Sequence, residues 1–260
     1  MLARTRPSFN PVHMISLYKK TWQMEDIMYI TCLDLEGVLV PEIWIAFAEA
    51  SGIPELRRTT RDEPDYEKLM KWRIGILREH KLGLKEIQET IARIEPLEGA
   101  KEFLDELRSM TQVIIISDTF TQFATPLMRK LGWPTIFCNS LEVAESGEIT
   151  GFKMRIENSK LATVRALQSI GYDTIASGDS YNDLGMIKAS KAGFLFKSTD
   201  KIKADNPGIP AYETYGELMS AIKGQWTKFS VCHLLCYTAF GFRFPIHQSG
   251  RGSILYYCTV

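Results

Sequence analysis

The run YITCLDLEGVL, residues 29–39, carries the strongest information about the fold. It starts with an apolar, strand-like segment at residues 29–33 and continues into Asp34, Glu36 and Gly37. Side chains two positions apart on a strand share a face, so a buried strand would deliver both carboxylates to one place. Glycine then lets the chain turn sharply. Two such acids can divide the nucleophile and acid/base roles, although the pair alone could equally be structural, because acids at strand ends are common.

Short apolar runs alternate with helical patterns across residues 28–223, which predicts an α/β fold, a doubly wound parallel sheet with helices on both faces. Further strands are predicted at residues 113–116, 135–138, 174–177 and 193–196, and helices at residues 98–108, 122–131, 159–170 and 182–189. About eighty residues separate the first two strands, far more than one crossover helix requires. The excess, residues 41–96, has helical patterns, and we interpret it as a cap over the carboxyl edge of the sheet, where open parallel sheets bind ligands.

Two further segments could bind a phosphate group. Ser117, Asp118 and Thr119 follow the predicted second strand, and a hydroxyl with free backbone N–H groups before a helix suits a phosphate oxygen. The alternative is that one of them merely caps the next helix. Lys160 lies in the first turn of a predicted helix, where its charge opposes the helix dipole unless an anion is nearby. Taken alone, it could be an ordinary solvated lysine.

The fourth segment is the most specific. Its strand ends at Gly178 and is followed by Asp179 and Asp183, four positions apart. Carboxylate oxygens grouped at a strand end suit Mg²⁺, a hard cation. Each of the four segments lies at the end of a predicted strand or at the start of the next helix. A parallel sheet would therefore bring them to one edge, and together they predict a site for phosphoryl transfer.

These segments, in this order, resemble the haloacid dehalogenase superfamily of phosphohydrolases. The superfamily pattern is matched here by Asp34-x-Glu36, Ser117, Lys160 and Gly178-Asp179-x-x-x-Asp183. A closer resemblance is to the branch of bifunctional phosphoserine phosphatase/homoserine phosphotransferases, through residues 34–47, 59–62, 64–66, 117–120 and 178–183. Glu36 replaces the usual second Asp of the superfamily, and we interpret it as a variant that this branch shares. The resemblance implies a haloacid dehalogenase-like Rossmannoid sheet with a helical cap inserted after the first strand.

The same resemblance implies a mechanism with Mg²⁺ as cofactor and an aspartyl-phosphate intermediate. Asp34 would be the nucleophile and Glu36 the acid/base. Mg²⁺ would be held by Asp34, the backbone carbonyl of Glu36, and Asp179, while Asp183 would orient Lys160 or a metal-bound water. The phosphoryl oxygens would be held by Ser117, the backbone N–H of Asp118, and Lys160. In the cap, Glu42 and Arg73 would bind the ammonium and carboxylate groups of phosphoserine, and Asn182 would touch substrate or phosphate.

The numbers of charged residues restrict the binding partners that the protein can be expected to have. Thirty-one basic residues balance 31 acidic ones, so no global field would recruit nucleic acid or a membrane surface. Small-molecule substrates, phosphoserine and with it homoserine, are expected instead, and a homodimer is compatible with the sequence. The five cysteines have no regular spacing that would indicate a disulfide framework, and a cytoplasmic location is expected.

We divide the chain into a core at residues 28–40 and 97–223, a helical cap at residues 41–96, and two flanking segments. Residues 1–27 show no apolar periodicity and are expected to lie outside the fold as a disordered extension, with a weak likeness to a transit peptide. Residues 224–260 form a tail of uncertain order. Two other functions stay open: a phosphatase of the same superfamily for another small phosphomonoester, and a non-catalytic binding module of the same fold.

Overall fold

The structure is a computed structural model that describes residues 28–59, 62–63 and 65–225. The predicted extension at residues 1–27 and nearly all of the predicted tail therefore lie outside the described residues. Contacts divide the chain into two units, Met1–Met219 and Ser220–Val260, and the described part of the second unit, residues 220–225, is helical. Among the described residues, no helix combines the length and the apolar character that crossing a membrane requires.

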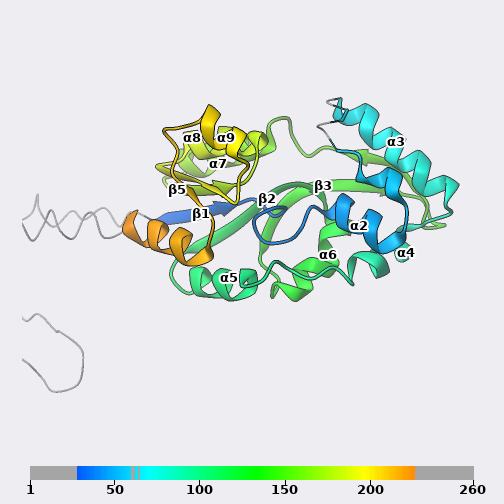
Figure 1. Cartoon of the computed structure of the whole chain (residues 1–260), viewed down its shortest axis with the longest axis horizontal. Helices are drawn as coiled ribbons and strands as arrows, with labels where there is room; N and C mark the ends of the chain where they lie inside the picture. The colour runs from blue at the N-terminus through cyan, green and yellow to red at the C-terminus, as the bar shows by residue number, and fades with distance from the viewer. Residues whose placement is uncertain (1–27, 60–61, 64, 226–260) are drawn as a thin grey trace, which may run out of the picture. The chain divides into compact units, whose positions relative to one another are not determined.

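The first unit alternates strands and helices, as the sequence predicts (Figure 1). Its strands are β1 (Tyr29–Leu33), β2 (Gln112–Phe120), β3 (Thr135–Val143), β4 (Ile149–Lys153), β5 (Asp173–Gly178), β6 (Ala192–Phe196) and β7 (Ala211–Tyr212). Its helices are α2 (Ile43–Ser51), η1 (Pro54–Arg57), α3 (Tyr66–Glu79), α4 (Leu84–Ile91), α5 (Ala100–Arg108), α6 (Thr121–Lys130), α7 (Ser159–Ser169), η2 (Tyr181–Asp183), α8 (Leu184–Ala189) and α9 (Asp200–Asp205).

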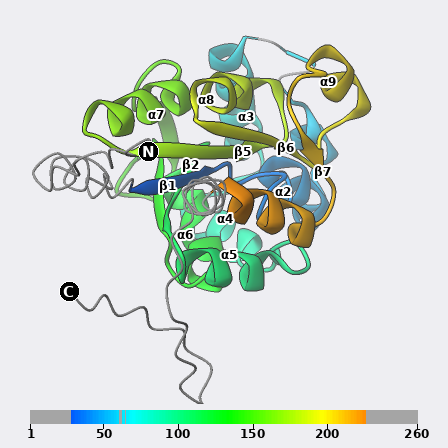
Figure 2. The ribbon, with the colours of Figure 1, turned by 90° about the vertical axis from the view of Figure 1, so that its left-hand side faces the viewer.

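The strands form one sheet in the order β4-β3-β2-β1-β5-β6-β7. Strand β1 lies in the middle and pairs in parallel with β2 and β5, so that Leu33 is opposite Ile115 on one side and Ser177 on the other. Helices α7 and α8 cover one face and α5 and α6 the other, as Figure 2 shows. A strand covered on both faces is mostly apolar, which explains why β1 is hydrophobic except for the buried Thr31. The predicted α/β class and doubly wound sheet are confirmed.

One strand departs from the predicted all-parallel sheet. Strand β3 continues five residues beyond the predicted end at Cys138, turns through Gly147 with a φ of +87°, and returns as β4, which pairs with β3 in antiparallel fashion. The segment mixes polar and apolar residues because it lies at the edge of the sheet, so it lacks the buried apolar run that marked the other strands. The short strand β7 at the opposite edge was also missed.

The inserted region holds α2, η1, α3 and α4. Helix α3 begins after Asp65, whose carboxylate accepts a hydrogen bond from the Lys68 N–H at 3.0 Å, a standard helix N-cap. The β3–β4 hairpin supports this region: Arg78 on α3 pairs with Glu148 at 2.6 Å, and the Leu84 N–H donates to the Gly147 carbonyl at 2.8 Å. The exact boundaries of the cap stay a prediction.

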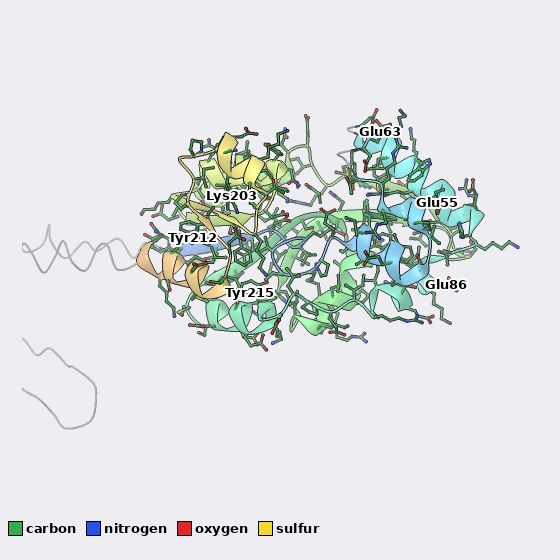
Figure 3. The ribbon with its side chains drawn as sticks, in the orientation of Figure 1. Glu55, Glu63, Glu86, Lys203, Tyr212 and Tyr215 are labelled. Carbon is green, nitrogen blue, oxygen red and sulfur yellow. The ribbon has the colours of Figure 1, made fainter. Side chains whose placement is uncertain are left out.

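Tyr215 fixes the turn that follows β1 (Figure 3). Its hydroxyl donates to the Val38 carbonyl at 2.6 Å, and its ring stacks on Phe103 with 4.9 Å between the centroids. Within the turn, Gly37 has a φ of +74°, a conformation that favours glycine, and its N–H donates to the Val40 carbonyl. Tyr215, a residue distant in sequence, therefore helps to fix the turn that carries Asp34 and Glu36.

Candidate active site

The carboxyl edge of the sheet opens into a cavity of about 1870 Å³. Its lining includes every predicted site residue except Asp183: Asp34, Glu36, Glu42, Arg73, Ser117, Asp118, Lys160, Asp179 and Asn182. The register explains the convergence, because the last residue of β1 is level with Ile115 and Ser177, just before the side chains in question. Asp183 is fully buried behind this surface, and it contacts the site residues Lys160 and Asp179.

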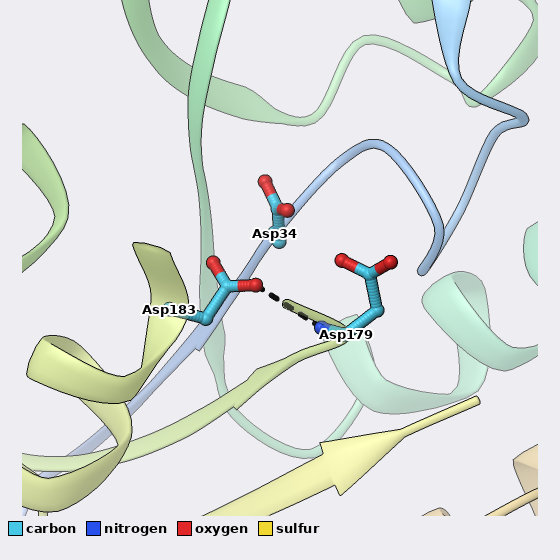
Figure 4. A group of neighbouring side chains, drawn as sticks. All are labelled: Asp34, Asp179 and Asp183. Carbon is cyan, nitrogen blue, oxygen red and sulfur yellow. Dashed lines mark hydrogen bonds between the residues drawn. The ribbon is translucent and has the colours of Figure 1, made fainter. Parts of the chain in front are cut away.

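Three carboxylates lie close together, two of them in the cavity lining (Figure 4). One oxygen from each of Asp34, Asp179 and Asp183 lies within 4.8 Å of the others. Asp183 is oriented by the Asp179 and Ser180 N–H groups, which donate to its Oδ2 at 3.1 and 3.0 Å. A set of hard oxygen donors of this kind fits Mg²⁺. The side chain of Glu36 is not in this group, so a metal role for Glu36 would have to come from its backbone carbonyl, as predicted.

Lys160 connects two of the carboxylates. Its Nζ lies 2.9 Å from Asp34 Oδ1 and 2.5 Å from Asp183 Oδ1, and the residue is only 3% exposed. Burial by itself lowers the pKa of Lys160, but the nearby carboxylates of Asp183, Asp34 and Asp118 outweigh it and raise the pKa. Lys160 therefore stays an ammonium group and supplies positive charge where an anion would bind.

Asp34 lies in an environment that opposes its ionisation. Burial, followed by the charge of Asp183, raises its pKa well above the ordinary value, and Lys160 acts in the opposite direction. A carboxylate must be ionised to act as a nucleophile. A cation among the three carboxylates would favour that ionised form, so this charge distribution also fits a metal site.

Glu36 has properties that suit proton transfer. Its Oε2 accepts a hydrogen bond from the Ile43 N–H at 2.8 Å, at the first residue of α2. Burial raises the pKa of Glu36 to about 7, against the lowering effect of this N–H group. An acid/base group works best with a pKa near the working pH, because both of its protonation states are then accessible.

Ser117 and Asp118 lie in an irregular part of β2. The β2–β3 pairing runs from Ile116 opposite Phe137 to Phe120 opposite Asn139, so the residues between them are displaced from the regular ladder. The Ser117 Oγ accepts a hydrogen bond from the Thr119 N–H at 3.2 Å. The irregular part of β2 lines the same cavity as Asp34, where a phosphate group could be held.

The cap contributes a buried cation. The Arg73 guanidinium stacks over the Trp44 ring at 4.4 Å, and its Nη2 donates to the Arg58 carbonyl at 2.7 Å. Its Nε is buried and has no hydrogen-bond partner among the residues that the structure describes. Burial lowers the pKa of Arg73 to about 10, although nearby Tyr66 and Glu36 raise it, and the group is still charged at neutral pH. Glu42 lines the same cavity, so one positive and one negative side chain contribute to the cavity that Asp34 also lines.

Sequence reasoning gave no role to four residues that contact the site. Trp44 stacks on Arg73, Tyr66 and Asn139 donate to the Asp118 carbonyl, and Ser159 donates to the Asp118 carboxylate. Only Tyr66 had a readable signal, because it lies seven positions before Arg73 and so on the same face of a helix. Asn182, predicted to touch substrate or phosphate, lines the cavity, and its side-chain amide donates to the Asp118 carboxylate at 2.9 Å.

Residues 32–191 match the family of haloacid dehalogenase-like hydrolases, a match that covers more than half of the chain. The chain belongs to this family. Phosphoserine phosphatase ThrH of Pseudomonas aeruginosa is 53% identical over 191 residues, which are 74% of this chain and 93% of that protein. A phosphoserine phosphatase of Pseudomonas syringae pv. tomato is 52% identical over 189 residues, 73% of this chain and 80% of that protein.

A solved structure extends the comparison to the fold of this haloacid dehalogenase-like chain. The crystal structure of a phosphoserine phosphatase in its apo form matches with a TM-score of 0.57 and 25% identity, over 73% of this chain and 95% of that one. The resemblance that the four sequence segments indicated is thereby confirmed, for the fold and for the enzyme family.

Proposed function

We propose that the protein is a Mg²⁺-dependent phosphatase that hydrolyses O-phospho-L-serine to serine and phosphate. One observation carries the substrate assignment. A single cavity is lined by buried carboxylates and a lysine, which suit a phosphoryl group, and also by the stacked Arg73 and by Glu42. Phosphoserine presents a phosphate at one end and an ammonium and a carboxylate at the other. The similarity to proteins named phosphoserine phosphatase supports the same assignment.

In the first step, a carboxylate oxygen of Asp34 attacks phosphorus and the bond between phosphorus and the serine oxygen breaks. Glu36 gives its proton to the departing serine oxygen, for which a pKa of about 7 is well suited. Ser117, the Asp118 N–H and the Lys160 ammonium hold the phosphoryl oxygens, where phosphoryl transfer requires electrostatic stabilisation. The products of this step are serine and an aspartyl phosphate at Asp34.

In the second step, Glu36, now ionised, takes a proton from water as the water oxygen attacks phosphorus. The bond between phosphorus and the Asp34 oxygen breaks, which releases phosphate and restores both carboxyl groups to their starting states. Using one residue as acid and then as base requires that both of its states be accessible, and the environment of Glu36 favours this.

Mg²⁺ would be held by Asp34 and Asp179, with the Glu36 carbonyl as a further oxygen and Asp183 in contact with Lys160. When bound, the ion offsets the negative charge shared by the carboxylates and the phosphoryl group. Asp183 keeps Lys160 in place, since its two oxygens are engaged by the lysine and by backbone N–H groups.

Arg73 would bind the substrate carboxylate through its unpartnered Nε and the neighbouring N–H groups. Stacking on Trp44 fixes the plane of the guanidinium, which limits the entropy lost when the substrate binds. Glu42 would bind the ammonium group. These contacts separate phosphoserine from sugar phosphates, which lack both charges.

The same aspartyl phosphate could pass to homoserine, an alcohol that carries the same ammonium and carboxylate groups as serine. The cavity, at about 1870 Å³, exceeds the roughly 300–1,000 Å³ of ordinary small-molecule pockets, so an acceptor alcohol has room to enter. Transfer to homoserine is therefore the second activity that we propose.

One assay tests both activities. The protein is incubated with phosphoserine and Mg²⁺, with and without homoserine, and inorganic phosphate and phosphohomoserine are measured. Phosphate release from phosphoserine that exceeds release from sugar phosphates supports the first proposal. Equal rates on all phosphomonoesters would contradict it, and an absence of phosphohomoserine would contradict the second.

A further inference from the structure

Asp118 makes hydrogen bonds to four other parts of the fold. Its carboxylate Oδ1 accepts from the Ser159 hydroxyl at 3.1 Å, and its Oδ2 accepts from the Asn182 side-chain amide at 2.9 Å. Its carbonyl accepts from the Asn139 amide at 2.9 Å and from the Tyr66 hydroxyl at 3.4 Å. Two of the other three predicted site segments, strand β3 and the first residue of α3 thus converge on this one residue.

A carboxylate at this place needs an explanation. Binding of a phosphoryl oxygen by the Asp118 backbone N–H would not require an acidic side chain, and a negative charge beside a phosphate site is electrostatically unfavourable. The carboxylate is also one of the charges that raise the pKa of Lys160. The electrostatic cost of the Asp118 carboxylate must be offset by a favourable interaction of this side chain. Both of its oxygens accept hydrogen bonds.

Each of these hydrogen bonds leads directly to a group of the proposed mechanism. Ser159 is the first residue of α7 and the immediate neighbour of Lys160, whose Nζ contacts Asp34. Asn182 belongs to η2, where the Ser180 N–H and hydroxyl donate to Asp183, one of the three clustered carboxylates. The Asp118 side chain therefore joins the lysine segment and the metal segment at the end of β2.

We propose that the Asp118 side chain is a positioning residue, which sets the placement of Lys160 and of the 179–183 loop relative to Ser117 through its bonds to Ser159 and Asn182. This inference rests on the proposed phosphoryl-transfer site at Asp34, and it adds a role for a side chain to which that mechanism assigns only a backbone contact. Catalysis depends on placement at this scale, because a misplacement of about 1 Å can reduce a rate by about a hundredfold.

The test uses three full-length variants: Asp118→Ala, Asp118→Asn, and the double variant Ser159→Ala/Asn182→Ala. Asparagine at position 118 can still accept from the Asn182 amide while it donates to the Ser159 hydroxyl, so it keeps both bonds without the charge. The donor is p-nitrophenyl phosphate with Mg²⁺, which needs the phosphoryl site but not recognition of an amino acid. A wild-type enzyme that cleaves this donor but not phosphoserine would disprove only the substrate assignment. The matched control is Glu145→Ala, which removes an exposed carboxylate that is not part of the cavity lining.

Positioning predicts that Asp118→Ala lowers kcat by about tenfold to a hundredfold, that the double variant loses about as much, and that Asp118→Asn stays within about threefold of wild type. The kcat of Glu145→Ala should be unchanged. The proposal is wrong if Asp118→Asn is as slow as Asp118→Ala, since the charge would then be what matters, or if Asp118→Ala is as fast as wild type.

A second measurement does not depend on turnover. Amide hydrogen exchange of the intact chain should become faster at residues 159–160 and 179–183 in Asp118→Ala, and stay at wild-type rates there in Asp118→Asn and Glu145→Ala. Unchanged exchange in Asp118→Ala would overturn the inference, because those segments would then be held without the carboxylate.

Discussion

Replacing Gly37 by alanine tests the link between the turn after β1 and the carboxylate cluster. Gly37 has a φ of +74°, and a Cβ built on it would lie 2.4 Å from Asp179 Oδ2 and 2.5 Å from Asp179 Cγ. Real Cβ atoms essentially never approach a neighbour within 3.0 Å. The Asp179 carboxylate must therefore move by at least about 0.6 Å, or the turn that carries Asp34 and Glu36 must move instead.

Two separate effects follow from this geometry. The left-handed backbone conformation costs an L-residue roughly 1–2 kcal/mol, which should appear as a lower free energy of unfolding. Displacement of Asp179 should in addition weaken Mg²⁺ binding by about tenfold to a hundredfold, the loss usual when the support of a metal ligand is disturbed. Turnover at saturating Mg²⁺ should fall by a comparable factor, because Asp34 and the cluster no longer align.

Gly52→Ala is the matched control, because Gly52 has a φ of +72° and nothing within 4 Å of a built Cβ. Both variants are measured by urea denaturation and by phosphoserine turnover as a function of Mg²⁺ concentration. Both should lose similar stability, and only Gly37→Ala should need more Mg²⁺. Equal Mg²⁺ dependence in the two variants would refute the reasoning, since the clash with Asp179 would then have no effect on the metal site.

Three further substitutions test three features of the site one at a time: substrate recognition, the buried ion pair and the acid/base residue. Arg73→Met should raise the KM for phosphoserine by about tenfold or more while p-nitrophenyl phosphate turnover is kept; a parallel loss on both donors would contradict a role in substrate recognition. Lys160→Met leaves Asp34 and Asp183 buried without their cation, and should lower the free energy of unfolding by about 3–5 kcal/mol in chelator, as urea denaturation can measure; unchanged stability would count against the buried pair. Glu36→Gln should release one p-nitrophenolate per active site in a rapid burst and then slow by about 10²–10⁴-fold, because an activated leaving group needs no acid but water still needs a base; steady turnover without a burst would exclude Glu36 as that base.

The parts of the fold that the sequence predicted correctly are those with the clearest periodicity. Strand β1 is mostly apolar because it is central, and the carboxyl ends of β1, β2 and β5 had to meet once those strands were parallel. Asp34, Ser117 and Asp179 could therefore be grouped before any coordinates were known. Lys160 could be added to this group because a cation in the first turn of a helix is unfavourable unless an anion lies nearby.

The parts that the sequence missed depend on side-chain packing between distant segments. Strand β4 lies at an edge and has no buried apolar run, and nothing local shows that Asp118 accepts hydrogen bonds from Ser159 and Asn182. The stacking of Arg73 on Trp44 arises from the way α2 and α3 pack, and no spacing within either helix predicts it. Such contacts are set by tertiary structure, which propensity and periodicity do not encode.

The claim that phosphoryl transfer passes through Asp34 is tested most directly by trapping the covalent intermediate. The protein is mixed with phosphoserine and Mg²⁺, quenched rapidly in acid, and digested for peptide mass spectrometry. We expect a phosphoryl group on the peptide that contains Asp34, with no adduct when Mg²⁺ is withheld and neither adduct nor turnover in Asp34→Asn. Phosphoserine hydrolysis by Asp34→Asn at the wild-type rate, or a phosphoryl group on a different residue, would contradict this mechanism.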